Sequence, residues 1–290
     1  IKDRGVKMKN RRRFILLVFI FFIIYVYINN ILKSKYYTEI HFLKLPTGDC
    51  TLIKSLDRNI IIGKAGKKDS KHIRHYLINQ KVDHISELII TYPDKDNVIG
   101  FFPVLHDLSI DKLYFPQTED LDVDTKEFLK IAKDKNISIY PINGKEKWEI
   151  NHWTLLFLRP LINSSIPESE RKAIIKFNFP QNSVLWLPDL NEVDKKDILL
   201  DSKALKADIL KVSGHNREIF LAKDFLDVVQ PKTIIFGDSG KINENELRRI
   251  YEWNVDTEVL SVEKEGDIMF YGKGNKYNIT TKRKMNIRIQ

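Results

Sequence analysis

The stretch Leu88-Ile89-Ile90-Thr91-Tyr92-Pro93-Asp94-Lys95-Asp96-Asn97 decides the fold of this chain. Its first three residues are an apolar run that predicts a buried strand, and the Pro, Asp and Asn residues that follow predict a loop. Carboxylate and amide side chains in such a loop can bind a metal ion or accept hydrogen bonds from backbone N–H groups. The stretch therefore predicts a strand whose carboxyl end carries candidate ligands.

The charge of the chain lies mainly at its two ends. Of the 290 residues, 43% are hydrophobic and 30% are charged, as in a globular protein, and the net charge is +9. Residues 1–35 contain nine basic side chains and one acidic side chain, and residues 273–290 contain six basic side chains and no acidic one. Residues 36–272 contain 33 basic and 38 acidic side chains, so the body lacks the basic balance expected of a protein that binds nucleic-acid backbones.

The basic segment 273–290 is interpreted as a solvated C-terminal tail. Contact of this tail with anionic lipid, cell-wall polymer or nucleic acid is the alternative interpretation. Cys50 is the one cysteine of the chain, so an intramolecular disulfide is excluded, and it is expected to be a small buried side chain.

Residues 14–32 predict a transmembrane signal anchor. They begin with the apolar and aromatic run FILLVFIFFIIYVYI, and 19 residues of helix span about 28 Å. Three arginines, at positions 11–13, precede the run, so the positive-inside rule places residues 1–13 in the cytoplasm. A cleaved signal peptide is the alternative, but no small-residue cleavage site follows. We therefore expect a single-pass protein of the cell membrane whose domain lies outside.

Apolar periodicity and turn residues predict a mixed α/β domain over residues 38–272. The expected strands are 38–45, 50–54, 59–62, 87–91, 112–115, 138–140, 147–150, 154–158, 171–177, 183–187, 207–212, 233–236, 256–260, 267–271 and 277–281. The expected helices are 70–79, 98–107, 125–133, 191–201, 217–229 and 243–253, with Pro103 shortening or bending the second. Strands open each half and helices follow, which predicts two packed sheets with helices outside.

Five short motifs occur along this domain in a fixed order: Gly48-Asp49, Ile60-Ile61-Ile62-Gly63, the loop Thr91–Asn97, Leu185-Trp186-Leu187-Pro188-Asp189 and Leu210-Lys211-Val212-Ser213-Gly214-His215. In order and spacing they resemble the metallo-β-lactamase domain at the C-terminus of the competence protein ComEC and its stand-alone relatives. In that family the loop reads Thr-His-x-His-x-Asp-His. The resemblance covers about residues 38–272 and implies the αββα sandwich of the metallo-β-lactamase fold.

The resemblance also implies a metal-dependent hydrolase, because members of the family use one or two metal ions to hydrolyse phosphodiesters or esters. This chain departs from the family at five positions: Gly63 replaces an Asp, Tyr92, Asp94 and Asn97 replace the three loop histidines, and Gly214 replaces one His of a His-His pair. Three acidic residues of the family pattern are kept, namely Asp49, Asp96 and Asp189, together with His215.

The candidate metal ligands are therefore Asp94, Asp96, Asp189 and His215, and Asp96 is the candidate catalytic residue. Three carboxylates and one imidazole suit Mn²⁺ or Mg²⁺ better than the usual Zn²⁺. The loss of the loop histidines favours a protein without a cofactor, in which these side chains are ordinary polar loop residues. Elsewhere, His72 and His75 share one face of a predicted helix and are expected at the surface, and His41 is expected to pack in a strand.

The sequence thus predicts a membrane-anchored metallo-β-lactamase-fold protein with a degenerate metal site. Its expected role is binding or scaffolding of a protein or polymer partner whose identity the sequence leaves open. One alternative is a divergent metal-dependent hydrolase, similar to a phosphodiesterase or nuclease, with a carboxylate-rich site. Another is an accessory protein of DNA uptake, in which nucleic acid is a partner by family analogy alone.

Overall fold

The computed structural model describes residues 15, 18–25, 38–55, 58–92, 95–116, 118, 121–142, 144, 146–150, 153–159, 172–179, 182–213, 217–237, 240–273 and 276–281. The chain forms two units, Ile1–Tyr37 and Thr38–Gln290. In the first unit, residue 15 and residues 18–25 are helical and exposed. No helix within the described residues is long and apolar enough to cross a membrane. The remaining residues of the predicted anchor 14–32 lie outside the described part of the chain.

The first sheet of the second unit has eight strands in the order β15-β14-β1-β2-β3-β4-β5-β6. These strands are β1 (Thr38–Leu43), β2 (Asp49–Lys54), β3 (Asn59–Lys64), β4 (His84–Ile90), β5 (Ser109–Pro116), β6 (Ser138–Ile142), β14 (Ile268–Lys273) and β15 (Lys276–Thr281). Strands β3, β4, β5 and β6 are parallel to one another, whereas the pairs β15–β14, β14–β1, β1–β2 and β2–β3 are antiparallel.

The second sheet has seven strands in the order β13-β12-β11-β10-β9-β8-β7. These strands are β7 (Lys147–Ile150), β8 (Trp153–Arg159), β9 (Ile174–Asn178), β10 (Ser183–Trp186), β11 (Ile209–Val212), β12 (Thr233–Phe236) and β13 (Glu258–Ser261). Strands β10 to β13 are parallel, so their carboxyl ends meet at one edge of the sheet.

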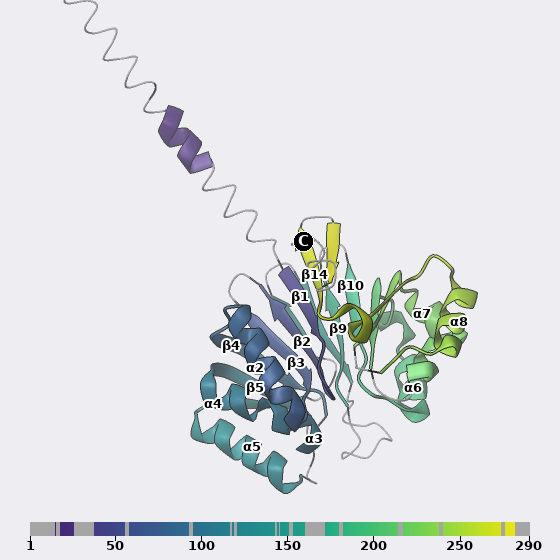
Figure 1. The fold of residues 1–290 in the computed structure, drawn as a ribbon, viewed down its shortest axis with the longest axis horizontal. Coiled ribbons are helices and arrows are strands. Elements are labelled where there is room, and N and C mark those ends of the chain that lie inside the picture. The colour runs from purple at the N-terminus through teal and green to yellow at the C-terminus, as the bar shows by residue number, and fades with distance from the viewer. Residues whose placement is uncertain are drawn as a thin grey trace, which may run out of the picture. The chain divides into compact units, whose positions relative to one another are not determined.

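Helices cover the outer face of each sheet (Figure 1). On the first sheet lie α2 (Ser70–Asn79), α3 (Lys95–Val98), α4 (Phe102–Asp107) and α5 (Val123–Asp134), with the 3₁₀ turns η1 (Lys67–Asp69) and η2 (Ile99–Phe101). On the second sheet lie α6 (Glu192–Leu199), α7 (Lys223–Val229) and α8 (Glu244–Trp253), with η4 (Ser202–Ala204) and η5 (Arg217–Leu221). The short helix α9 (Val262–Glu265) joins β13 to β14.

Alternation of side chains along the strands builds the layers. On β3, Ile60 and Ile62 lie in the core between the two sheets, whereas Ile61 lies in the core under α2, α4 and α5. The core between the sheets also contains Phe157 and Phe177, both fully buried. This two-residue period is the one that strand geometry imposes. The predicted αββα sandwich is therefore the architecture of residues 38–281.

Two predicted helices are divided in the structure. The segment 98–107 forms α3, η2 and α4, because Pro103 stands in the first turn of α4, where its missing N–H has no intrahelical partner to lose. The segment 217–229 forms η5 and α7, which are separated at Ala222. Asp49, expected in a turn, is the first residue of β2, and α9 was not expected.

We expect Phe177→Ala to lower the free energy of unfolding by about 3–5 kcal/mol, because the cavity lies between two sheets that cannot collapse onto it. Urea denaturation followed by circular dichroism measures this change. Tyr251→Ala, at a 45% exposed position of α8, is the control and is expected to change stability by less than about 0.5 kcal/mol. Equal effects of the two substitutions would contradict the assignment of the inter-sheet core.

Candidate functional site

The carboxyl ends of β3 and β4 in the first sheet and of β10, β11 and β12 in the second lie at one edge of the sandwich. The backbone N–H of Thr91 donates to the backbone carbonyl of Gly63 at 3.2 Å. The backbone N–H of Ala65 donates to the backbone carbonyl of Asn97 at 2.8 Å. The N–H of Ala173, just before β9, donates to the carbonyl of Thr91 at 2.8 Å. Because Ala173 leads into β9 of the second sheet and Thr91 directly follows β4 of the first, this last bond joins the two sheets at the start of the loop Thr91–Asn97.

A buried cluster of charged and polar side chains joins the two sheets at this edge. The Lys211 ammonium contacts Asp49 Oδ2 and donates to Ser213 Oγ at 2.5 Å, and the Ser213 hydroxyl donates to the same Asp49 oxygen. Lys211 is 0%, Asp49 1% and Ser213 2% exposed. The ammonium also lies 4.1 Å from the centroid of the Trp186 ring, and Trp186 Nε1 donates to Thr51 Oγ1 at 3.1 Å. Strand β2 is thereby tied to β10 and β11.

Strand alternation explains why these side chains meet. Asp49 and Thr51 are two residues apart on β2, and Trp186 and Lys211 are register partners on β10 and β11. All four side chains face the space between the sheets, in line with the apolar core residues. A lysine buried in this space retains its charge at the least cost when a carboxylate and a hydroxyl satisfy its donors.

Two glycines leave room for this cluster. A Cβ at Gly237, directly after β12, would collide with the Lys211 side chain. Gly63 has a φ of +151°, and a Cβ there would collide with the backbone of Asp49 and Cys50. Gly63 occupies the position of an acidic residue in the resembled motif, so the backbone conformation itself excludes a carboxylate at this point of the edge.

The position of the first loop histidine is also occupied by a structural contact. Lys172 Nζ lies 5.5 Å from the centroid of the Tyr92 ring and 3.6 Å from Asp194 Oδ2 in the first turn of α6. A cation above an aromatic face is attracted by the electrons of the ring. Tyr92 therefore helps to hold the segment before β9 against the loop.

The structure places two of the four predicted ligands. Asp96 is exposed in α3, and Asp189 is partly exposed after β10. Asp94 and His215 lie outside the described residues, so convergence of the four side chains stays a prediction. Among the residues that are described, no group of three or more His, Cys, Asp or Glu side chains is placed to hold a metal ion. The described donors alone do not fit a metal site, and Asp49 is committed to Lys211.

Sequence reasoning retained Asp49 but missed the contributions of Lys211, Ser213 and Trp186. The sequence does contain a signal for this buried cluster, because Lys211 interrupts the otherwise apolar strand β11 at an inward-facing position. A lysine at such a position requires a buried carboxylate partner. The identity of that partner, 162 residues away in the sequence, could not be read from the strand.

The two sheets, their outer helices and the loop-bearing edge define a metallo-β-lactamase fold. The metallo-β-lactamase fold protein YhfI of Bacillus subtilis superimposes with a TM-score of 0.55 over 81% of this chain and 100% of that chain, at 11% identity. A mutant of the β-hydroxylase CmlA superimposes with a TM-score of 0.54 over 80% of this chain and 53% of that chain, at 9% identity. Identities this low establish the fold alone.

In sequence, the chain is similar to ComE operon protein 3 of Bacillus subtilis (strain 168), with 21% identity over 170 residues. The match spans 58% of this chain but 22% of the length of that protein. No protein-family model matches the chain. The resemblance to the ComEC-type metallo-β-lactamase domain is thus confirmed.

Replacing Lys211 by Met is expected to lower the free energy of unfolding by about 3–5 kcal/mol, because Asp49 is left charged and buried without its partner. The double variant Asp49→Asn/Lys211→Met removes both charges and is the matched control. We expect it to be more stable than the sum of the single variants implies, by about 0.5–3 kcal/mol. Denaturant titration of the four proteins measures the coupling, and additive effects would show that the pair does not tie the sheets.

Proposed function

We propose that this chain is a membrane-anchored metallo-β-lactamase-fold protein outside the cytoplasm, with a degenerate metal site and a binding or scaffolding role. The observation that supports the degenerate site is the conformation of Gly63, which is incompatible with the acidic side chain of the resembled motif. The cation–π contact between Lys172 and Tyr92 also supports a degenerate site, since Tyr92 stands where the family has a histidine ligand.

The anchor rests on the sequence of residues 14–32, which is long and apolar enough to span a bilayer as a helix. The basic residues 11–13 support a cytoplasmic N-terminus. The partner of the domain is a protein or polymer, and the slightly acidic balance of residues 36–272 does not favour nucleic acid. A role as an accessory of DNA uptake therefore rests on family analogy alone.

A divergent hydrolase is the second candidate, and the position of Asp96 and Asp189 favours it. Asp96 lies in α3, shortly after β4, and Asp189 follows β10, and neither side chain is buried. Together with Asp94 and His215 they would make a carboxylate-rich donor set of the kind that suits Mn²⁺ or Mg²⁺, with Zn²⁺ as the family alternative. Such an ion would act as a Lewis acid toward a phosphodiester.

Metal analysis of the purified chain separates the two candidates. We expect less than a stoichiometric amount of Mn, Fe or Zn by mass spectrometry, and an unfolding temperature that EDTA leaves unchanged, because the edge is held by Lys211 and Asp49. Asp189→Ala is expected to change neither result. Stoichiometric metal in the parent chain that is lost on Asp189→Ala would overturn the proposed function and favour the hydrolase.

A further inference from the structure

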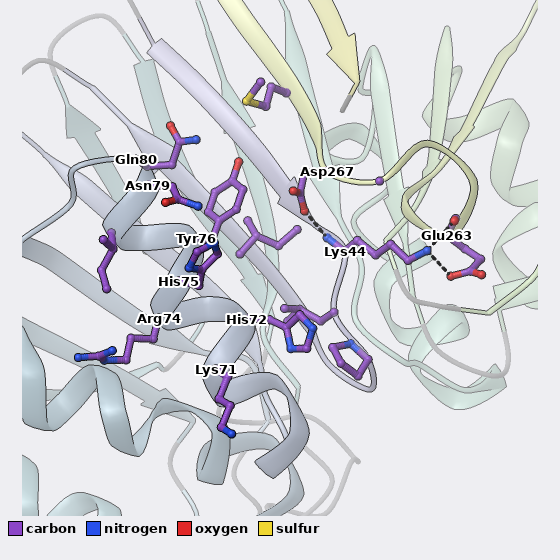
Figure 2. A pocket seen from close by; sticks show the side chains of 16 residues that line it. Lys44, Lys71, His72, Arg74, His75, Tyr76, Asn79, Gln80, Glu263 and Asp267 are labelled. Atoms are coloured by element: carbon purple, nitrogen blue, oxygen red, sulfur yellow. Dashed lines mark hydrogen bonds and ion pairs between the residues drawn. The ribbon is translucent and has the colours of Figure 1, made fainter. Parts of the chain in front are cut away.

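A groove of about 1090 Å³ runs along α2, and the ion pairs around it are shared with water. The Lys44 ammonium lies 3.0 Å from Glu263 Oε2 (Figure 2), and Arg74 Nε lies 2.5 Å from Asp107 Oδ2. All four of these side chains are at least 33% exposed. Because water screens exposed pairs, a change in their protonation has little effect on the fold.

Glu87 on β4 forms an ion pair of a different kind. Its side chain is 3% exposed, and its Oε1 accepts a hydrogen bond from Arg58 Nη1 at 2.7 Å. Its Oε2 is buried, and no described residue donates a hydrogen bond to it. Glu87 is the register partner of Ile60 on β3, so its side chain faces the space between the sheets. A charge on this carboxyl is costly, because one oxygen has lost water without gaining a donor.

Burial outweighs the positive charges near Glu87. The titratable groups that face it come from three elements and are Arg58 before β3, His84 on β4, and Asp111, Lys112 and Tyr114 on β5. Burial raises the pKa of Glu87, although the charges of Arg58 and Lys112 act to lower it. The folded protein therefore favours the protonated carboxyl more than the unfolded chain does.

Arg58 ends the segment that connects β2 to β3. The Ser55 N–H donates to the Arg58 carbonyl at 2.9 Å, and Asn59 Nδ2 donates to the His84 carbonyl at 3.0 Å. The Arg58 side chain is 37% exposed, although its guanidinium contacts a buried carboxylate. Water can therefore hydrate the guanidinium when this contact is lost, whereas Asn59 stays bound to β4.

We propose that Glu87 is a proton-binding group that controls the contact with Arg58, and with it the attachment of the β2–β3 connection to β4. The ionised carboxylate holds the guanidinium through a charge-assisted hydrogen bond, which is about twice as strong as a neutral one. Uptake of one proton from solvent on Oε2 neutralises the carboxyl, and this strong contact is lost. The connection is thus held more tightly at high pH than at low pH.

Carbon-13 NMR of the full chain, labelled at its glutamate carboxyl groups, measures the protonation of Glu87. Its signal is the one that Glu87→Gln removes. We expect its titration midpoint to lie above that of a glutamate in an unstructured peptide, because burial favours the neutral form. Arg58→Ala is expected to raise the midpoint further, since a nearby positive charge is lost. Arg248→Ala, at an exposed position of α8, is the control and should leave the midpoint unchanged.

The same proton links stability to pH. A carboxyl whose pKa is raised by folding contributes stability that is fully present below the unfolded-state pKa and is lost as pH rises through the folded-state pKa. Over this window, the urea midpoint of the parent chain is expected to fall relative to that of Glu87→Gln as the pH rises. A difference that does not depend on pH, an NMR midpoint at or below that of the peptide, or equal effects of Arg58→Ala and Arg248→Ala would overturn the proposal.

Hydrogen exchange at one neutral pH tests the attachment of the connection, with Glu87→Gln as a copy of the neutral carboxyl. The Ser55 amide, which is bonded to Arg58, is expected to exchange several-fold faster in the variant than in the parent chain. The Lys232 amide, which donates to the Asp208 carbonyl in the second sheet, is the control and should exchange at the same rate in both. Unchanged exchange at Ser55 would show that Glu87 does not control the connection, and would overturn the proposal.

Discussion

The buried ion pair between Lys211 and Asp49 is the interaction on which the functional edge depends. Removing two charges from water costs several kcal/mol per ion, and this cost is offset where the geometry is good and the remaining donors are satisfied. Ser213 accepts from the ammonium and donates to the carboxylate, and the Trp186 ring covers the cation. The pair therefore helps to fix how β2 of the first sheet approaches β11 of the second.

The same constraint extends to the residues around the pair. Gly237 must lack a side chain because the lysine passes over it, and Gly63 must lack one because the backbone of β2 lies against it. The Lys211 side chain and the backbone of β2 therefore fill the space at this edge that side chains at these two positions would need. Of the predicted ligands, Asp96 in α3 and Asp189 after β10 lie outside this pair. On the outer face of the first sheet, a separate set of hydrogen bonds joins the buried His41 to Glu39 and Tyr76.

Much of the architecture was predictable from local patterns. The helix expected at residues 70–79 is α2 with the same bounds, and the strands expected at 147–150 and 233–236 are β7 and β12. These segments combine a clear apolar period with turn residues at both ends, so local preference and tertiary packing agree. Prediction failed where the two differ: the segment 98–107 has helical composition, but packing and Pro103 divide it into three short pieces.

The sequence by itself determined the order of strands and helices, the resemblance to a metallo-β-lactamase domain and the loss of the loop histidines. These properties follow from periods of two and 3.6 residues and from motif order, which are local or nearly so. Only the tertiary structure decided that Lys211 meets Asp49, that Gly63 has no room for a carboxylate, and that His41 pairs with Tyr76. The physical reason is that each contact joins segments from different strands, sheets or helices, and their separation in space is set by the packing of the whole domain.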